Sequence, residues 1–253
     1  FAGDYGISKN PESTAWDNFR LYFTDMQRGA VLRLTNNGLT PISSVGMKTW
    51  FRENLKLTNN LLGTFDTING EYNLTLNYKP AVKKRNTTIS FNEASKGWIS
   101  FKSFIPEAGE SVSGKYLTNV GGNVWEHYHD ILNSLETQVI NRNTFYGEGE
   151  DYYTASTIDV LFNDMPGFVK SFRTCNYEGS QGKINQFVNS GDFAAMQPDG
   201  VTPFNDTDGE YYNLQAMDGW YVKNIITDQS DTASIPEFIE KEGKWFNSIG
   251  GDN

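Results

Sequence analysis

Short runs of alternating apolar and polar residues, separated by turn residues, recur along this sequence and restrict the folds open to it. The clearest run is YNLTLNY, in which Tyr72, Leu74 and Leu76 alternate with Asn73 and Thr75. Alternation with a period of two places the apolar residues on one face of a β-strand and the polar residues on the other. We therefore expect antiparallel sheets whose strands have one packed face and one wet face.

Turn sequences predict which strands pair. Asn69-Gly70 is a strong hairpin signal, because both central positions of a type I′ turn need positive φ. It predicts a hairpin between 62–66 and 72–78. Further hairpins are predicted at 21–43, 87–105, 114–128, 156–177 and 209–228.

One pattern occurs twice: Phe, Thr or Asn, Asp, Met, a short spacer, Gly, any residue, Val, at 23–31 and at 162–169. The simplest explanation is a repeated hairpin. Two longer stretches also recur in similar form. GEYNL (70–74) resembles GEYYNL (209–214), and KGWISFKSFI (96–105) resembles DGWYVKNIIT (218–227). Related sheet units of this kind suggest propeller blades, but closed propellers need at least about four blades and the predicted strands make about three. A sandwich remains the alternative.

Few segments have helical spacing. Residues 44–57 carry Met47, Phe51 and Leu55 at intervals of four, with Ser44 as the expected N-cap. Residues 234–243 begin with Ser-Ile-Pro and end at a glycine, which also predicts a helix. The fold class expected is all-β, built from antiparallel hairpin units, propeller-blade-like or sandwich, with one or two short helices.

The sequence predicts three segments. Residues 1–60 form an N-terminal hairpin plus a short helix. Residues 61–180 form a central antiparallel unit with an insertion at 130–155, and the part of this insertion at 130–141 is predicted to be either a short helix or a loop. Residues 181–253 form a C-terminal hairpin and a short helix. The chain starts at Phe1 without a methionine and stops at GGDN, so we expect a portion of a longer polypeptide.

The composition argues against two classes of binding partner. The net charge is −10, which repels phosphate backbones and anionic membrane surfaces, so neither nucleic acid nor a membrane is expected as a partner. No apolar stretch is long enough to span a bilayer. Aromatic residues reach 14% and favour sheets over helix bundles, because these side chains pack well on a pleated surface. The single cysteine, Cys175, rules out an internal disulfide framework.

Catalytic motifs are missing from the sequence. It holds no G-x-S-x-G elbow, P-loop or dinucleotide fingerprint, and no spacing selects a pair among its 31 acidic residues. His127 and His129, the only histidines, would share one strand face beside Glu126 and Asp130, but no third ligand motif accompanies them. We therefore expect no enzyme activity, no cofactor and no metal site.

A series of runs carries a family resemblance. YFTDMQRGAVLRLTNNGLTPISSVGMKTWF (22–51), LLGTFDTINGEYNLTL (61–76) and ISFNEASKGWISFKSFIPEAG (89–109) are followed by VKSFRTCNYEGSQ (169–181), GWYVKNIITD (219–228) and FIEKEGKWFN (238–247). In this order they resemble the large virion structural proteins of tailed bacteriophages, of the type found in marine cyanophages and crAss-like phages. The resemblance covers most of the chain, except the individual loops at 106–157 and 189–208. The family's motifs carry no catalytic residues.

The resemblance implies a virion location and a structural role in a tail, neck or surface appendage. The expected partners are other virion proteins, with self-association into a homo-oligomer as a further expectation. The alternative is an adhesion module that binds a receptor or host surface glycan. Exposed loop aromatics are the candidate contacts for either role: Phe145, Tyr146, Tyr152 and Tyr153. The competing interpretation is that these rings close a small core beneath the insertion.

Overall fold

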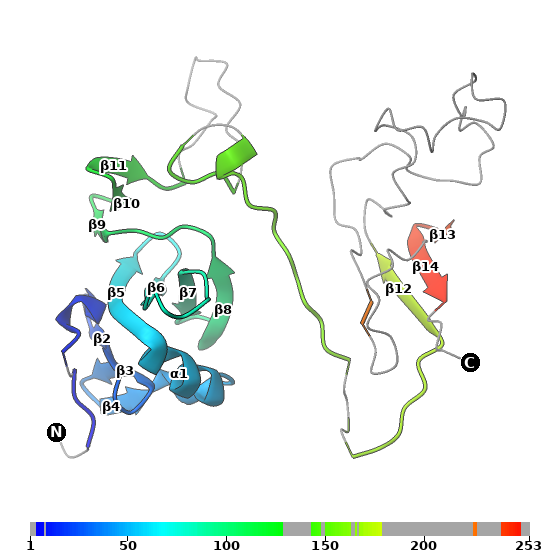
Figure 1. The fold of residues 1–253 in the computed structure, drawn as a ribbon, viewed down its shortest axis with the longest axis horizontal. Coiled ribbons are helices and arrows are strands. Elements are labelled where there is room, and N and C mark those ends of the chain that lie inside the picture. Colours follow the sequence, from blue (N-terminus) through cyan, green and yellow to red (C-terminus); the bar gives the residue numbers. More distant parts are fainter. Residues whose placement is uncertain are drawn as a thin grey trace. The chain divides into compact units, whose positions relative to one another are not determined.

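The computed structural model describes residues 4–7, 9–128, 143–147, 150–162, 165, 167–178, 225–226 and 239–248. The chain is all-β with a few short helices, as the alternation predicts, and it divides into two compact units, residues 1–159 and residues 160–253 (Figure 1). None of the described helices is long and apolar enough to cross a membrane.

Four antiparallel sheets contain the described strands. The N-terminal sheet has β1 (Ala15–Asp17), β2 (Arg20–Asp25), β3 (Ala30–Thr35) and β4 (Gly38–Pro41). The central sheet has β5 (Thr58–Asp66), β6 (Glu71–Tyr78), β7 (Thr87–Asn92) and β8 (Gly97–Lys102). The cover sheet has β9 (Ala108–Val112), β10 (Lys115–Val120) and β11 (Asn123–Glu126). The C-terminal sheet has β12 (Thr174–Glu178), β13 (Ile239–Lys241) and β14 (Lys244–Ser248).

Helical turns are short. They are η1 (Pro11–Ser13), η2 (Ile42–Ser44), α1 (Lys48–Asn54), η3 (Leu55–Leu57) and η5 (Glu150–Tyr152). The predicted helix at 44–57 is therefore confirmed as α1 and η3, with Phe51 and Leu55 fully buried. Its predicted N-cap is wrong, because Ser44 ends η2 and its hydroxyl donates to the Pro41 carbonyl at 2.6 Å.

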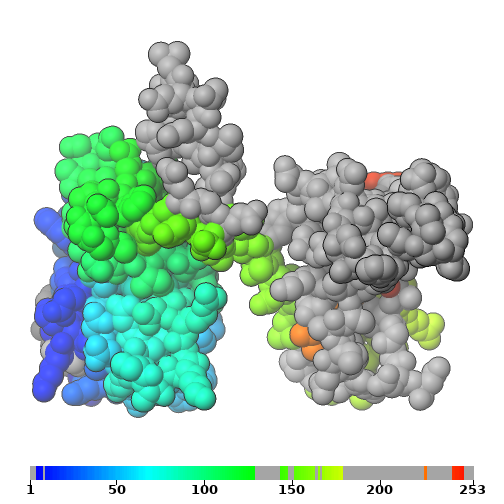
Figure 2. Space-filling view, turned by 45° about the horizontal axis from the view of Figure 1, so that its top comes forward, coloured from blue at the N-terminus to red at the C-terminus, as the bar shows by residue number. Residues whose placement is uncertain are grey.

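The apolar core of unit 1 lies between the N-terminal sheet and one face of the central sheet, and α1 closes it. The Tyr22 ring stacks on Tyr72 at 4.8 Å and on Phe65 at 5.6 Å, joining β2 to β6 and β5. Phe51 of α1 lies 4.5 Å from the ring of Trp98 in β8. Figure 2 shows the blue N-terminal strands against the cyan central strands as one continuous body.

The opposite face of the central sheet is buried too, which makes the predicted wet face of β6 wrong. Asn73 and Thr75 are 1% exposed because the cover sheet lies over them. The Tyr116 hydroxyl of β10 accepts a hydrogen bond from Asn73 Nδ2 at 3.3 Å and lies 2.7 Å from Thr64 Oγ1. This polar layer stays buried because its groups are paired with one another.

Hairpins form at most of the predicted places, with one correction. β5 pairs with β6, but their connection is the four-residue turn 67–70, in which only Gly70 has positive φ, so it is not a two-residue type I′ turn. Paired positive φ occurs at Ser113-Gly114, at Gly121-Gly122 and at Glu242-Gly243.

The C-terminal half departs further from the sequence predictions. The described residues between 156 and 173 contain no strand, so the predicted 156–177 hairpin is wrong and β12 pairs with β14 instead. Residues 239–241, predicted as helix, form β13, because the Glu242-Gly243 turn sends the chain back along β14. The described sheets show no ring of propeller blades; unit 1 is a layered stack of sheets.

Some predictions concern residues outside the described ranges. They are the hairpin at 209–228 apart from 225–226, the start of the helix at 234–243, the segment 130–141, and His129 with Asp130. The division into segments 1–60, 61–180 and 181–253 stays a prediction.

Candidate functional site

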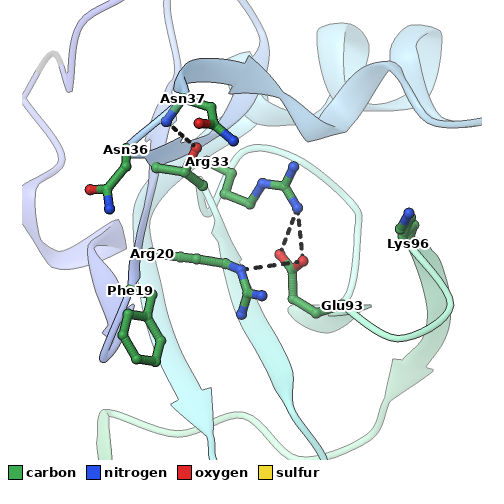
Figure 3. Close-up of a pocket in the computed structure, with 8 residues that line it drawn as sticks. Phe19, Arg20, Arg33, Asn36, Asn37, Glu93 and Lys96 are labelled. Atoms are coloured by element: carbon green, nitrogen blue, oxygen red, sulfur yellow. Dashed lines mark hydrogen bonds and ion pairs between the residues drawn. The ribbon is translucent and has the colours of Figure 1, made fainter.

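Three hairpin turns of unit 1 converge on an open polar cleft of about 410 Å³ (Figure 3). Phe19 comes from the β1–β2 turn, Asn36 and Asn37 from the β3–β4 turn, and Glu93 and Lys96 from the β7–β8 turn. The remaining lining residues are Arg20, Arg33 and Thr35. The cleft thus combines residues from the N-terminal and central sheets.

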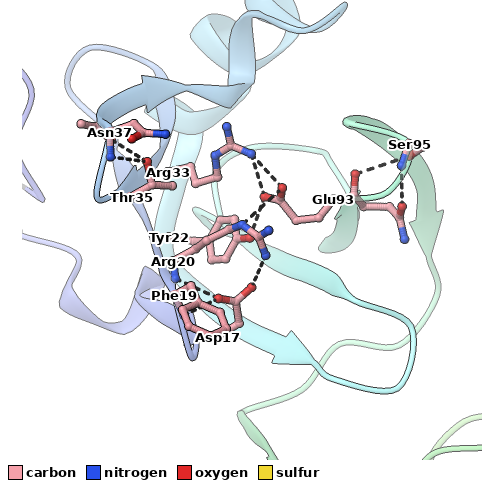
Figure 4. A network of polar contacts seen from close by, with 11 residues as sticks. Asp17, Phe19, Arg20, Tyr22, Arg33, Thr35, Asn37, Glu93 and Ser95 are labelled. Atoms are coloured by element: carbon pink, nitrogen blue, oxygen red, sulfur yellow. Dashed lines mark hydrogen bonds and ion pairs between the residues drawn. The ribbon is translucent and has the colours of Figure 1, made fainter.

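Glu93 is the centre of the polar network in the cleft (Figure 4). Arg33 Nη1 donates to both of its carboxylate oxygens, at 3.1 Å and 2.7 Å, and the Tyr22 hydroxyl donates to Oε1 at 2.7 Å. Arg20 Nε lies 3.6 Å from Oε2. Two guanidinium groups are therefore held side by side around one carboxylate.

Asp17 positions the second arginine. Its Oδ1 accepts the backbone N–H groups of Phe19 and Arg20 at 2.9 Å and 2.8 Å, and its Oδ2 accepts Arg20 Nη1 at 2.7 Å. This hydrogen bond to Asp17, and then the charge of Glu93, raise the pKa of the Arg20 guanidinium. Burial, followed by the hydrogen bond to Glu93, raises the pKa of the Tyr22 hydroxyl. Both groups keep their protons at neutral pH.

Several donors in the cleft have no partner among the residues that the structure describes. Within the described ranges, no contact engages Nη2 of Arg20, Nη2 of Arg33 or Nζ of Lys96. The exposed side-chain amides of Asn36 and Asn37 are likewise unpaired there. Phe19, 78% exposed, adds an aromatic surface beside Arg20. The arrangement can therefore hydrogen-bond a polar ligand and stack a ring against it.

The predicted contact residues Phe145 and Tyr146 belong to a second aromatic cluster. Phe145 lies 5.4 Å from the Phe104 ring and 5.8 Å from His127, and the Tyr146 hydroxyl lies 3.1 Å from Thr118 Oγ1. Both side chains are half-buried. This position matches the competing interpretation, in which the insertion's rings close a small core over the cover sheet.

Tyr152 and Tyr153 are about half exposed. Tyr153 pairs with Thr144 in an isolated antiparallel bridge, and Tyr152 packs so closely on Gly147 that a Cβ there would lie 2.4 Å from its ring. The structure therefore separates the four predicted contacts into two packed rings and two accessible rings.

His127 is buried rather than arranged as a ligand. Its Nε2 lies 2.7 Å from Thr118 Oγ1, and its ring packs 4.8 Å from both Phe104 and Tyr116. Burial lowers its pKa to about 4, and the nearby charge of Asp66 opposes that shift. Within the part of the chain that the structure describes, no group of three His, Cys, Asp or Glu side chains could hold a metal ion.

The described residues between 154 and 173 form no strand, and many of their large apolar side chains are exposed. The described ones are Ile158, Val160, Leu161, Phe162, Met165, Phe168, Val169 and Phe172. Water-exposed apolar side chains are normal singly, but such a concentrated run is typical of a surface that contacts a partner. The local pattern of these residues predicts a hairpin, and nothing in it indicates that their side chains are exposed.

The cleft was also missed by sequence reasoning. The only local signal for it is WDNFR (16–20), a turn with an exposed aromatic residue at each side of Asp17 and Asn18. Nothing local connects that turn to Glu93, because their proximity depends on the packing of two sheets.

No protein-family model matches this chain. No curated protein matches it either.

Proposed function

We propose that this chain is a structural component of a tailed-bacteriophage virion, placed in a tail, neck or surface appendage, and that it acts through contacts with other virion proteins. The ordered series of runs that resembles such proteins supports the proposal. So does the fold, because layered antiparallel sheets give a stiff body, and the strands at the ends of each sheet have one edge without a neighbour in that sheet.

The observation that carries the proposal is the exposed apolar run between 158 and 172. Ile158, Val160 and Phe162 recur with a period of two in extended backbone. An extended segment of this kind can add as a strand to the sheet edge of a neighbour, where its main chain supplies hydrogen bonds and its alternate side chains fill apolar pockets. Such an addition would bury side chains that are exposed in the isolated chain.

Replacing Val160 and Phe162 together by serine tests this function. Both side chains are largely exposed, so the isolated variant should keep its melting temperature. In the phage whose genome encodes the chain, the variant should fall about tenfold or more in purified particles, measured by quantitative mass spectrometry. Trp16→Ser changes a large apolar side chain that is 65% exposed and lies outside the segment, and it serves as the control.

Two results would contradict the proposal. One is absence of the unmodified chain from purified particles. The other is incorporation of the Val160→Ser, Phe162→Ser variant at the normal level. The adhesion alternative, with Tyr152 and Tyr153 as glycan contacts, stays a prediction that a glycan array with Tyr152→Ala and Tyr153→Ala variants can test.

A further inference from the structure

We propose that the polar cleft of unit 1 is a binding site for a saccharide that carries a carboxylate. This inference goes beyond the assembly function and does not depend on it, because the cleft shares no residue with the 154–173 segment. Its volume of about 410 Å³ lies within the usual range of small-ligand sites, about 300–1,000 Å³.

The charge of the cleft points to an anionic ligand. Three cationic side chains line it, Arg20, Arg33 and Lys96, against one carboxylate, Glu93. Glu93 pairs with Arg33 at 2.7 Å and Asp17 pairs with Arg20 at 2.7 Å, so the net positive charge at the cleft is that of Lys96, while both guanidinium groups keep an unused donor. This is a local positive site in a chain whose net charge is −10. Recognition must therefore act at contact range, since the field of the whole chain repels anions.

The mixture of donors and acceptors points to a hydroxylated ligand rather than to bare phosphate. A phosphate only accepts hydrogen bonds from protein donors, whereas sugar hydroxyls both donate and accept. Glu93 already accepts three hydrogen bonds, two from Arg33 and one from Tyr22, and Arg20 Nε lies 3.6 Å from Oε2, so the acceptors for a ligand hydroxyl are the amide oxygens on the β3–β4 turn. The amides of Asn36 and Asn37 supply both kinds of group on the neighbouring turn (Figure 3).

Phe19 supplies the third element, an apolar surface for a sugar ring. The ring is 78% exposed, and the backbone N–H of this residue is fixed by Asp17, so the position of the turn is set in advance. Figure 3 places Phe19 on one side of the two arginines and Lys96 on the other. A ring stacked on Phe19 can therefore direct a carboxylate toward the cationic side of the cleft, where guanidinium and ammonium groups bind carboxylates well.

Isothermal titration calorimetry on the full chain tests the proposal. The probes are trigalacturonate, a glucuronate-containing tetrasaccharide and sialyllactose, each compared with its methyl ester. The ester keeps the rings and hydroxyls and removes only the charge. At least one acid should bind about tenfold more tightly than its ester, as expected for the loss of a charge-assisted hydrogen bond.

Two surface variants assign the binding to the cleft. Lys96→Gln should weaken binding of the acid about tenfold and leave the ester nearly unchanged. Phe19→Ala should weaken the acid and the ester alike, by about three- to tenfold. Lys48→Gln, the same change on an exposed lysine of α1 outside the cleft, should alter neither. Unchanged melting temperatures would show that the variants are folded.

Three outcomes would overturn the proposal. The first is no measurable binding of any of the three acids. The second is equal affinity for acid and ester, which would remove the carboxylate from the recognition. The third is competition by inorganic phosphate at the same concentration together with no effect of Phe19→Ala, which would reveal a simple anion site.

Discussion

Buried polar side chains in unit 1 are retained by specific partners. Thr88 donates its hydroxyl proton to the Phe104 carbonyl at 2.7 Å, so Thr75, 2.8 Å away, must be the donor to Thr88. Ser90 in turn donates to Asn73 Oδ1. Leaving one of these buried groups without a hydrogen-bond partner would lower the free energy of unfolding by about 1–3 kcal/mol. Each side chain of the layer is therefore stable in the core only while its partner is present.

The burial of His127 should make the free energy of unfolding depend on pH. Its folded pKa is about 4, below the ordinary value of about 6.5, so the unfolded chain binds the proton more readily. The free energy of unfolding should fall as the pH drops below about 6.5 toward 4, by about 2 kcal/mol between pH 7 and pH 5. Urea unfolding at the two pH values measures it.

The matched variant for this test is His127→Gln, which keeps a polar group near Thr118 and cannot titrate. Its stability should lack the part of the pH dependence that His127 causes, while the other titrating groups contribute equally to both proteins. Identical pH dependence in the two proteins would show that His127 does not cause the loss.

At the scale of elements, packing decides which turn signals become hairpins. The first copy of the repeated pattern forms the β2–β3 hairpin, where Asp25 Oδ1 accepts the Arg28 backbone N–H at 3.1 Å and the strands cover the central sheet. The second copy, at 162–169, has no described strand and exposes its apolar side chains. A two-stranded hairpin without a packed face is marginally stable, so the same local pattern gave two outcomes.

Gly29 shows how the first hairpin depends on α1. Its φ is +66°, and a Cβ there would lie 2.6 Å from the backbone Cα of Arg52. Gly29→Ala should lower the free energy of unfolding by about 2–4 kcal/mol, combining a left-handed backbone with overpacking. Chemical denaturation followed by tryptophan fluorescence measures the loss.

Gly46→Ala separates the two causes. The φ of Gly46 is +71°, and a Cβ there would meet no atom within 4 Å. Gly46→Ala should therefore lower the free energy of unfolding only by the penalty of a left-handed backbone, about 1–2 kcal/mol. Equal losses for the two variants would mean that the close approach between the β2–β3 turn and α1 does not contribute.

At the scale of the whole molecule, the boundary between the two units falls inside the exposed 154–173 segment. Extended, exposed backbone is the preferred site of proteolysis, whereas paired strands are protected. Limited chymotrypsin digestion should therefore cut first after Leu161, Phe162, Phe168 or Phe172, and mass spectrometry of the fragments locates the cuts. First cuts within β1–β11 would contradict this expectation.

The sequence alone determined the all-β class, the short helix near Phe51 and the β2–β3, β5–β6, β7–β8 and β10–β11 hairpins of unit 1, because period-two alternation and turn residues act over a few neighbouring positions. It could not determine that both faces of β6 are buried, since polar Asn73 and Thr75 become core residues only when Tyr116 covers them.

The candidate site belongs to the same class of unpredicted features. Phe19, Asn36 and Glu93 lie on turns far apart in the sequence, and only the packing of the N-terminal sheet on the central sheet, through Tyr22, brings them to one cleft. Local patterns therefore decided which strands form, and long-range contacts between sheets decided which polar residues are buried and which meet at the surface.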